Sequence, residues 1–186
     1  MAASKLRISG GSARGIPVTE PKGLRLRPTS GLVREALFNI LGDLVDEARV
    51  LDLYAGTGAI GIEALSRGAA SAEFIDAEAA SCQAILQTLA RAGVAERATV
   101  LRGRLPAALT TLKGTFSLIF MDPPYALDTA EETLRALSAH AAPGGLVVYE
   151  HATRYNPPER PRGLSLTERR VYGDSALALY ALQEGE

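Results

Sequence analysis

The stretch DLYAGTGAIG, residues 52–61, decides the fold of this chain. It begins within an apolar run typical of a buried strand (50–55) and leads into a run typical of a helix (58–67). Gly56, Gly58 and Gly61 let the backbone come close to a ligand at the N-terminus of that helix, which is positively polarised. The pattern predicts a site for a nucleotide-containing ligand, although a tight strand-to-helix turn without a ligand has the same spacing.

Strand-like and helix-like runs alternate on both sides of this stretch. The strand-like runs are 50–55, 71–77, 98–103, 116–122 and 145–151, and the helix-like runs are 58–67, 78–92, 104–112 and 128–141. Such alternation predicts an α/β fold with a mostly parallel sheet covered by helices on both faces. Residues 164–172 and 175–182, separated by Gly173 and Asp174, predict an antiparallel hairpin that closes one edge of the sheet.

The front of the chain has a different pattern. Two short extended stretches, 5–9 and 15–19, are separated by glycines and predict a small β-hairpin or loose ribbon. Thr29 or Ser30 is suited to cap a helix over 32–41, whose apolar residues recur at intervals of three and four. We therefore expect an N-terminal hairpin extension over 1–28 and a main domain over 29–186.

Composition limits the classes of protein to consider. The chain has 186 residues, one cysteine and two histidines, so an internal disulfide and a zinc site built on cysteines are excluded, and no metal is expected. It has no secretory signal and no long apolar run, which predicts a cytoplasmic protein without membrane contact. Residues 1–40 carry seven basic and two acidic residues, whereas the remainder is net negative. A basic front suggests contact with a polyanion such as RNA, or a merely solvated loop.

Carboxylates near the glycine loop add to the predicted site. Asp52 lies in the preceding strand, where it could meet a cationic amino group or hold the loop, and Asp76 ends the next strand, where a carboxylate can accept both hydroxyls of a ribose. These features suit NAD and S-adenosylmethionine equally well. The candidate cofactor-binding residues are Asp52, Ala55, Gly56, Thr57, Gly58 and Asp76.

The motif Asp122-Pro123-Pro124-Tyr125 follows a strand at the same predicted edge and favours S-adenosylmethionine. Methylation of an exocyclic amino group requires acceptors that orient its N–H bonds. Asp122 can supply one acceptor and the carbonyl of Pro123 the other, since proline fixes the backbone and has no competing N–H. Tyr125 can stack on the base, a contact of about 1–3 kcal/mol. The four motif residues are the catalytic candidates.

These motifs resemble the RsmD-type methyltransferases of bacterial small-subunit ribosomal RNA, as do RISGGSARGIPV (7–18) and RPTSGLVREALFNIL (27–41). The resemblance implies a Rossmann-like class I methyltransferase fold and methyl transfer from S-adenosylmethionine to N2 of one guanine. It also implies an assembled or nearly assembled small ribosomal subunit as substrate, with neighbouring ribosomal proteins as further partners. Leu32, Thr88 and Arg104 depart from the family pattern, where arginine, asparagine and an acidic or amide residue are usual.

The basic front supplies the candidates for contact with RNA phosphates: Arg7, Arg14, Arg25, Arg27 and Arg34. Three alternatives stay open, namely an adenine-N6 methyltransferase acting on DNA or RNA, an NAD-dependent oxidoreductase, and a catalytically silent RNA-binding module. Cys82 and His151 are interpreted as structural residues, although His151 beside Glu150 has the composition of a catalytic pair.

Overall fold

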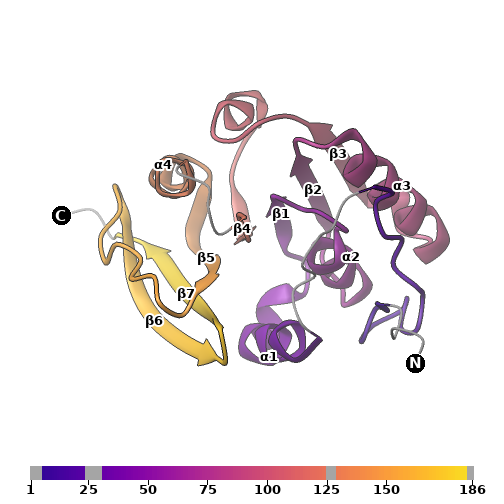
Figure 1. Ribbon diagram of the computed structural model, residues 1–186, viewed down its shortest axis with the longest axis horizontal. Coiled ribbons are helices and arrows are strands. Elements are labelled where there is room, and N and C mark those ends of the chain that lie inside the picture. The colour runs from indigo at the N-terminus through magenta and orange to yellow at the C-terminus, as the bar shows by residue number, and fades with distance from the viewer. Residues whose placement is uncertain (1–5, 24–30, 125–128, 184–186) are drawn as a thin grey trace.

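The computed structural model describes residues 6–23, 31–124 and 129–183 and contains one seven-stranded sheet of order β3-β2-β1-β4-β5-β7-β6 (Figure 1). The strands are β1 (Arg49–Leu53), β2 (Ser71–Asp76), β3 (Ala98–Arg102), β4 (Phe116–Met121), β5 (Ala141–Ala152), β6 (Leu164–Tyr172) and β7 (Ser175–Leu182). The helices are α1 (Gly31–Leu41), α2 (Ala59–Ser66), α3 (Ala79–Ala92) and α4 (Ala130–Ala136). Short 3-10 turns follow as η1 (Gly42–Val45), η2 (Ala95–Arg97), η3 (Ala107–Thr111) and η4 (Leu137–Ala139).

Strand direction confirms the predicted sheet. β1 pairs in parallel with both β2 and β4, β2 with β3, and β4 with β5. β7 pairs antiparallel with β5 on one side and with β6 on the other, so the last two strands form the expected hairpin at one edge. The chain therefore turns away from β1 in two directions, toward β2 on one side and β4 on the other. The carboxyl ends of β1 and β4 lie side by side at this switch point, which is where open α/β sheets bind ligands.

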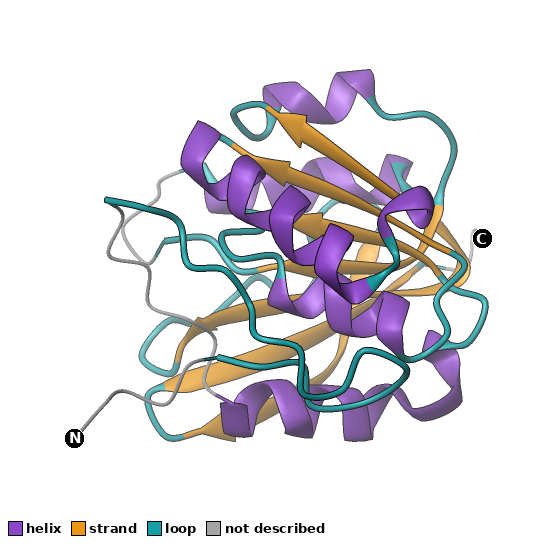
Figure 2. Cartoon of the chain, turned by 90° about the vertical axis from the view of Figure 1, so that its right-hand side faces the viewer, coloured by secondary structure: helices purple, strands orange, loops and turns teal. Residues whose placement is uncertain are grey.

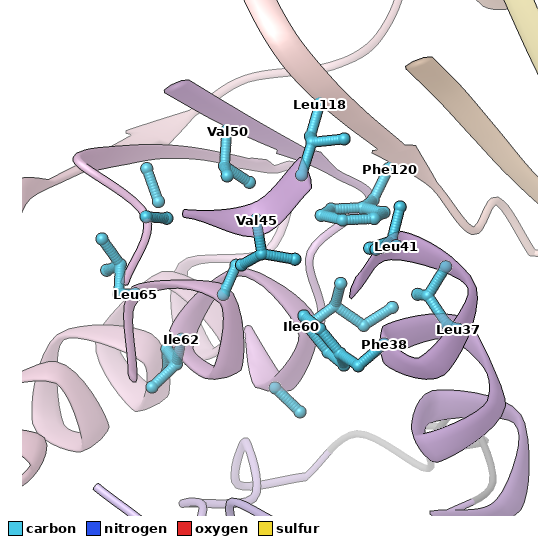
Figure 3. Close-up of a cluster of buried hydrophobic side chains, with 14 of the residues drawn as sticks. Leu37, Phe38, Leu41, Val45, Val50, Ile60, Ile62, Leu65, Leu118 and Phe120 are labelled. Atoms are coloured by element: carbon cyan, nitrogen blue, oxygen red, sulfur yellow. The ribbon is translucent and has the colours of Figure 1, made fainter. Parts of the chain in front are cut away.

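Two apolar clusters cover the two faces of the sheet, because successive residues of a strand point to opposite sides. Val50 packs in the cluster that also contains side chains of α1, α2 and α3, part of which is drawn in Figure 3. Its neighbour Leu51 packs in the second cluster, with Leu134 of α4 and Leu109 of η3. Figure 2 shows helices covering the strands. The prediction of helices on both faces is confirmed.

Three predicted boundaries were wrong. The run 104–112 forms the 3-10 turn η3 instead of an α-helix, because the hydroxyls of Thr110 and Thr111 bond carbonyls three residues back and compete with helical bonding. β5 begins at Ala141, four residues before the predicted strand. The run 128–141 contains only the short helix α4 and the turn η4.

The N-terminal ribbon, residues 6–23, packs against the main domain. Its two arms approach through the bridge between Arg7 and Pro17 and the bond from the Ile8 amide to the Ile16 carbonyl, 3.0 Å. Ile8, Ala13 and Val18 are buried in the same cluster as α1, α2 and α3. The ribbon thus contributes to the core, and the expected domain boundary at residue 28 falls outside the described residues, as do Thr29 and Ser30. Within the described ranges, no helix combines the length and apolarity needed to span a bilayer.

Candidate functional site

The glycine loop follows β1 and the Asp-Pro-Pro segment follows β4, so the two predicted motifs meet at the switch point of the sheet. Gly56 and Gly58 have φ angles of 56° and 70°, in the left-handed region that favours glycine. A Cβ at Gly58 would also lie 2.8 Å from the side chain of Ile85 on α3. Glycine at 58 is therefore needed both for the turn into α2 and for the packing of α3 behind it.

Asp76 holds the loop from the end of β2. Its Oδ2 accepts the amide N–H of Gly56 at 2.7 Å, and its Oδ1 accepts the amide N–H of Glu78 at 2.8 Å. Asp76 is half-buried, and each carboxylate oxygen can accept more than one hydrogen bond. The side chain can therefore fix the loop and still accept bonds from a ligand at the sheet edge.

Asp52 is buried and holds the first turn of α2. Its Oδ2 accepts the amide N–H of Gly61 at 2.9 Å. Burial raises the pKa of Asp52 to about 7, the charge of Asp76 acts in the same direction, and the bond from Gly61 opposes both. A Cβ at Gly61 would lie 2.4 Å from the ring of Phe74, so this glycine allows α2 to pack closely on β2. Of the two roles expected for Asp52, holding the loop is the one that the structure shows.

The Asp-Pro-Pro segment lies beside Glu150, a carboxylate that the sequence analysis considered only as a neighbour of His151. Asp122 is half-buried, Pro123 is buried and Pro124 is exposed, whereas Tyr125 falls outside the described residues. The last pair between β4 and β5 joins Met121 to Tyr149, so the next residues, Asp122 and Glu150, lie at the same level of the sheet. Glu150 is 7% exposed. Its only signal in the sequence was a charged residue near the end of a strand-like run.

His151 does not form a pair with Glu150, because neighbouring residues of a strand point to opposite faces. The His151 ring is 2% exposed, its Nδ1 lies 2.8 Å from the carbonyl oxygen of Ala152, and its centroid is 5.4 Å from Tyr149 and 5.7 Å from Tyr155. Burial lowers the pKa of His151, so the ring is neutral near pH 7. These contacts agree with the structural interpretation of His151.

Phenol groups line the α4 side of the same edge. The Tyr54 hydroxyl lies 2.9 Å from Oγ1 of Thr133 on α4, and the Tyr155 hydroxyl donates to Oε1 of Glu131 at 2.6 Å. Burial raises the pKa of Tyr149 to about 12, and the charges of Glu131 and Asp122 act in the same direction. Tyr149 therefore stays protonated near neutral pH, buried in the cluster on the α4 face of the sheet.

Glu63, in the second half of α2, contacts both the N-terminal ribbon and α1. Glu63 is fully buried, and its Oε2 lies 2.9 Å from Nε of Arg34 while its Oε1 lies 2.7 Å from Nη2 of Arg67. The hydroxyl and amide of Ser9 also donate to this carboxylate. Arg34 donates further to the carbonyl of Arg7 at 2.6 Å. The sequence signal for this contact was a single acidic residue in a mostly apolar helix, and the sequence analysis did not use this signal.

Arg34 was expected to contact RNA phosphates, and its burial corrects that prediction. Only 5% of its side chain is exposed, because pairing with Glu63 turns it into the protein. We therefore remove Arg34 from the residues proposed to contact RNA. Arg7 and Arg14 are exposed on the ribbon, whereas Arg25 and Arg27 fall outside the described residues.

The glycines of the front segment dock the ribbon on the end of α2. Oγ of Ser66 accepts the amide of Ala13 at 2.8 Å and donates to the carbonyl of Gly10 at 2.7 Å. Gly11 has a φ of 75°, and a Cβ there would lie 1.9 Å from the carbonyl oxygen of Ser66. The close approach of two backbones thus explains Gly11, whereas a Cβ at Gly10 would meet the side chain of Arg67.

Two positions that depart from the family pattern have clear places in the structure. Thr88 is fully buried in α3, where its Oγ1 accepts the amide of Thr19 at 3.0 Å and donates to the carbonyl of Ala84 at 3.0 Å. It therefore ties the ribbon to α3. Arg104 is exposed just after β3. Among the described residues, no group of three or more His, Cys, Asp or Glu side chains is arranged to hold a metal ion.

Comparison with known proteins adds to this geometry. The family model described as "Conserved hypothetical protein 95" matches residues 6–181. The Ribosomal RNA small subunit methyltransferase D of Escherichia coli K12 is 36% identical over 180 residues, which cover 95% of this chain and 89% of that protein. The chain belongs to the RsmD family. Another RsmD relative, the "Putative rRNA methyltransferase YlbH" of Bacillus subtilis, is 32% identical over 94% of this chain and 98% of its own length.

Solved structures confirm the class I methyltransferase fold of this RsmD family member. The "Putative methyltransferase yhhF" of Escherichia coli has a TM-score of 0.82 and 34% identity, covering 98% of this chain and all of its own. A putative RNA methyltransferase of Pyrococcus horikoshii has a TM-score of 0.71 at 15% identity, covering 89% of this chain and 90% of its own, which shows a shared fold alone. Membership of the RsmD family makes the protein a methyltransferase.

Proposed function

We propose that this protein transfers a methyl group from S-adenosylmethionine to the N2 amino group of a guanine in small-subunit ribosomal RNA. The observation that carries the proposal is the meeting of the glycine loop and Asp122 at the carboxyl ends of β1 and β4. Relatives named as small-subunit ribosomal RNA methyltransferases support the substrate class.

The residues at the glycine loop suit S-adenosylmethionine. Ala55 and Gly56 are half-exposed and have little or no side chain, so a ligand can approach the backbone where α2 begins. Asp76 has the acceptor capacity to bind ribose hydroxyls. Ala55, Gly56, Thr57, Gly58 and Asp76 would hold the ligand, and Asp52 would act indirectly by holding α2. A structure with a TM-score of 0.61 and 13% identity, a putative methyltransferase complexed with SAH, is consistent with this use of the fold.

Asp122 is the residue that orients the target base in the proposed mechanism. S-adenosylmethionine, when bound, supplies an electrophilic methyl group attached to a sulfonium sulfur. The carboxylate of Asp122 accepts one N–H of the guanine amino group and the carbonyl of Pro123 accepts the other, which directs the nitrogen lone pair out of conjugation with the ring. Positioning of this kind contributes about 7–11 kcal/mol to lowering a barrier.

The same carboxylate manages the charge that develops. The amino nitrogen would become cationic as its bond to the methyl carbon forms and the bond between that carbon and the sulfonium sulfur breaks. Asp122 would stabilise that charge and take the departing proton or pass it to water. Tyr125 stacks on the base, and the base must be unpaired or flipped out to expose its amino group. Arg7, Arg14, Arg25 and Arg27 hold the RNA backbone, and neighbouring ribosomal protein contributes to selecting the site.

The test is methyl transfer from isotopically labelled S-adenosylmethionine to small ribosomal subunits that lack guanine-N2 methylation, followed by mass spectrometry of nucleosides. We expect label in N2-methylguanosine. Asp122→Ala should reduce the rate by about 10²–10⁴-fold with unchanged S-adenosylmethionine affinity, since the change removes a proton acceptor and leaves the glycine loop intact. The control Asp43→Ala, at an exposed residue of η1, should keep full activity.

Other outcomes would replace the proposal. Label in methyladenosine, or activity on adenine-containing DNA, would keep the chemistry and change the base. Binding of NAD without binding of S-adenosylmethionine would favour an oxidoreductase. A function in cells that survives Asp122→Ala would favour a catalytically silent RNA-binding module.

A further inference from the structure

Residues 153–173 carry a second excess of positive charge, apart from the basic front. This segment has five arginines and two acidic residues, whereas residues 41–152 have eight basic and fourteen acidic residues. All five arginines are exposed: Arg154, Arg160, Arg162, Arg169 and Arg170. Arg154, Arg169 and Arg170 lie beside the turn between β6 and β7, and we call them the C-terminal arginine surface; Arg160 and Arg162 lie nearer to the start of β6, toward the opposite edge of the sheet.

The turn of the C-terminal hairpin lies at the same edge of the sheet as Asp122. β5 runs parallel to β4, and its last residue, Ala152, pairs with Ser175 at the start of β7. Ser175 also pairs with Tyr172 at the end of β6. The amide of Thr153 donates to the carbonyl of Asp174 at 2.9 Å, which fastens the start of the loop 153–163 to this turn.

Most of the positive charge on this surface has no acidic partner among the described residues. Arg169 donates to the carbonyls of Thr153, 2.7 Å, and Tyr155, 3.4 Å, which fixes its position and leaves its charge uncompensated. Arg170 is paired with Glu168. In the part of the chain that the structure describes, no ion pair involves Arg154, Arg160 or Arg162.

A purely protective role would explain only part of this pattern. Charged residues on an edge strand prevent pairing with other chains, and Arg169 and Arg170 lie on the edge strand β6. The other three arginines lie on the loop before β6, where protection of a strand edge does not require them. A polyanion is the partner that suits exposed guanidinium groups spread along both loop and strand.

We infer that the C-terminal arginine surface binds the RNA phosphate backbone on the side of the site opposite to the N-terminal ribbon. Figure 1 shows β6 and β7 at one end of the sheet and the ribbon beside α2 and α3 at the other, with β4 between them. The RNA would then be held on both sides of Asp122. This inference deepens the proposed function and rests on it, because it assumes an RNA substrate.

The test compares Arg154→Gln, Arg169→Gln and their double variant with Lys113→Gln, a matched control at an exposed lysine between η3 and β4. The measurement is binding to unmethylated small ribosomal subunits across a range of salt concentrations. Each phosphate contact that is lost should reduce the slope of log affinity against log salt by about 0.7–0.9, so we expect about 1.5 for the double variant. Lys113→Gln should match the unsubstituted protein, as should the S-adenosylmethionine affinity and thermal midpoint of every variant.

A charge-preserving variant separates phosphate contact from a local structural role. Arg154→Lys combined with Arg169→Lys should keep the salt slope, because phosphate contacts depend on charge. Unchanged binding by the double Gln variant, or equal loss in the double Lys variant, would overturn the inference while guanine methylation by the unsubstituted protein upheld the proposed function. Failure of the unsubstituted protein to bind and methylate small subunits would overturn both.

Discussion

Two buried carboxylates, Asp52 and Glu63, lie at the two halves of helix α2, and they differ in the charge of the groups around them. At the first turn of the helix, Asp52 accepts the amide N–H of Gly61, and the acidic Asp76 adds to the burial that raises the pKa of Asp52. In the second half of the helix, Glu63 is flanked by Arg34 and Arg67. Both carboxylates are buried, yet only the second is neutralised by charge. A buried acid therefore has to be interpreted from its partners, and not from its burial.

The difference in charged partners matches the different contacts that the two halves of α2 make. The first half lies at the proposed ligand site, where the carboxylates of Asp52 and Asp76 accept backbone amides and hold the glycine loop. The second half joins α1 and the N-terminal ribbon to the sheet, and an ion pair in a buried place fixes their relative positions. The arginine that sequence analysis assigned to RNA, Arg34, belongs to this second function.

The largest expected effect is that of Glu63→Gln. The change leaves the guanidinium groups of Arg34 and Arg67 without their carboxylate in a buried place, and such a loss costs about 3–5 kcal/mol of the free energy of unfolding. Denaturant unfolding measures it. Glu168→Gln, which breaks the exposed pair with Arg170, is the control and should leave the stability nearly unchanged. Equal stability of the two variants would show that the Glu63 contact does not hold the ribbon and α1.

Asp52→Asn should raise the free energy of unfolding at neutral pH, whereas Glu63→Gln should lower it. The pKa of Asp52 is raised to about 7 in the folded protein, so the folded state keeps a proton that the unfolded state releases above about pH 4. The stability that this proton contributes is complete below about pH 4 and is lost as the pH rises through about 7. The upper limit of the loss is about 4 kcal/mol, at 1.36 kcal/mol for each pKa unit.

Unfolding free energies measured from pH 4 to pH 8 test this expectation. The difference between the unsubstituted protein and Asp52→Asn should shrink or reverse as the pH rises, whereas Asp43→Asn, at an exposed residue, should show a constant difference. A constant difference for Asp52→Asn as well would mean that the folded protein does not raise the pKa of Asp52.

Gly61→Ala should have a smaller effect on stability. The new Cβ would lie 2.4 Å from the ring of Phe74, and overpacking of this kind costs about 1–3 kcal/mol. It should also weaken S-adenosylmethionine binding, because the first turn of α2 shifts away from Asp52. Gly31→Ala in α1, where a Cβ meets no atom within 4 Å, is the matched control and should be neutral or slightly stabilising. Thermal midpoints and a ligand titration measure both variants.

The smallest effect is expected for Arg14→Ala on the exposed tip of the ribbon. Loss of one phosphate contact should weaken binding to small subunits severalfold and reduce the salt slope by about 0.7–0.9, with unchanged stability. Arg27→Ala is expected to act in the same way. Arg34→Ala, in contrast, should lower the free energy of unfolding, because it leaves Glu63 with a single arginine. A salt slope reduced by Arg34→Ala in a fully stable protein would contradict its assignment to the core.

Local patterns were sufficient to predict most of the sheet and the core of the site. The runs 164–172 and 175–182 coincide with β6 and β7, and the helix expected over 78–92 matches α3 to within one residue. The helix predicted over 104–112 was wrong because threonine hydroxyls there bond nearby carbonyls and compete with the hydrogen bonds of an α-helix. The position of Glu150 beside Asp122 was missed because it depends on pairing between two strands, and no pattern within one strand contains that information.

The sequence by itself determined the order of strands and helices along the chain, the glycine loop and the motif at Asp122. These features depend on residues that are neighbours in the chain. Only the tertiary structure decided which charges are available to a partner. Seven basic residues in the first forty predicted one RNA-binding front, yet Arg34 turns inward to Glu63, and five exposed arginines lie at the far end of the sheet. The physical reason is that a charge is stabilised or left free by groups distant in sequence, and those groups meet only when the sheet and its helices have assembled.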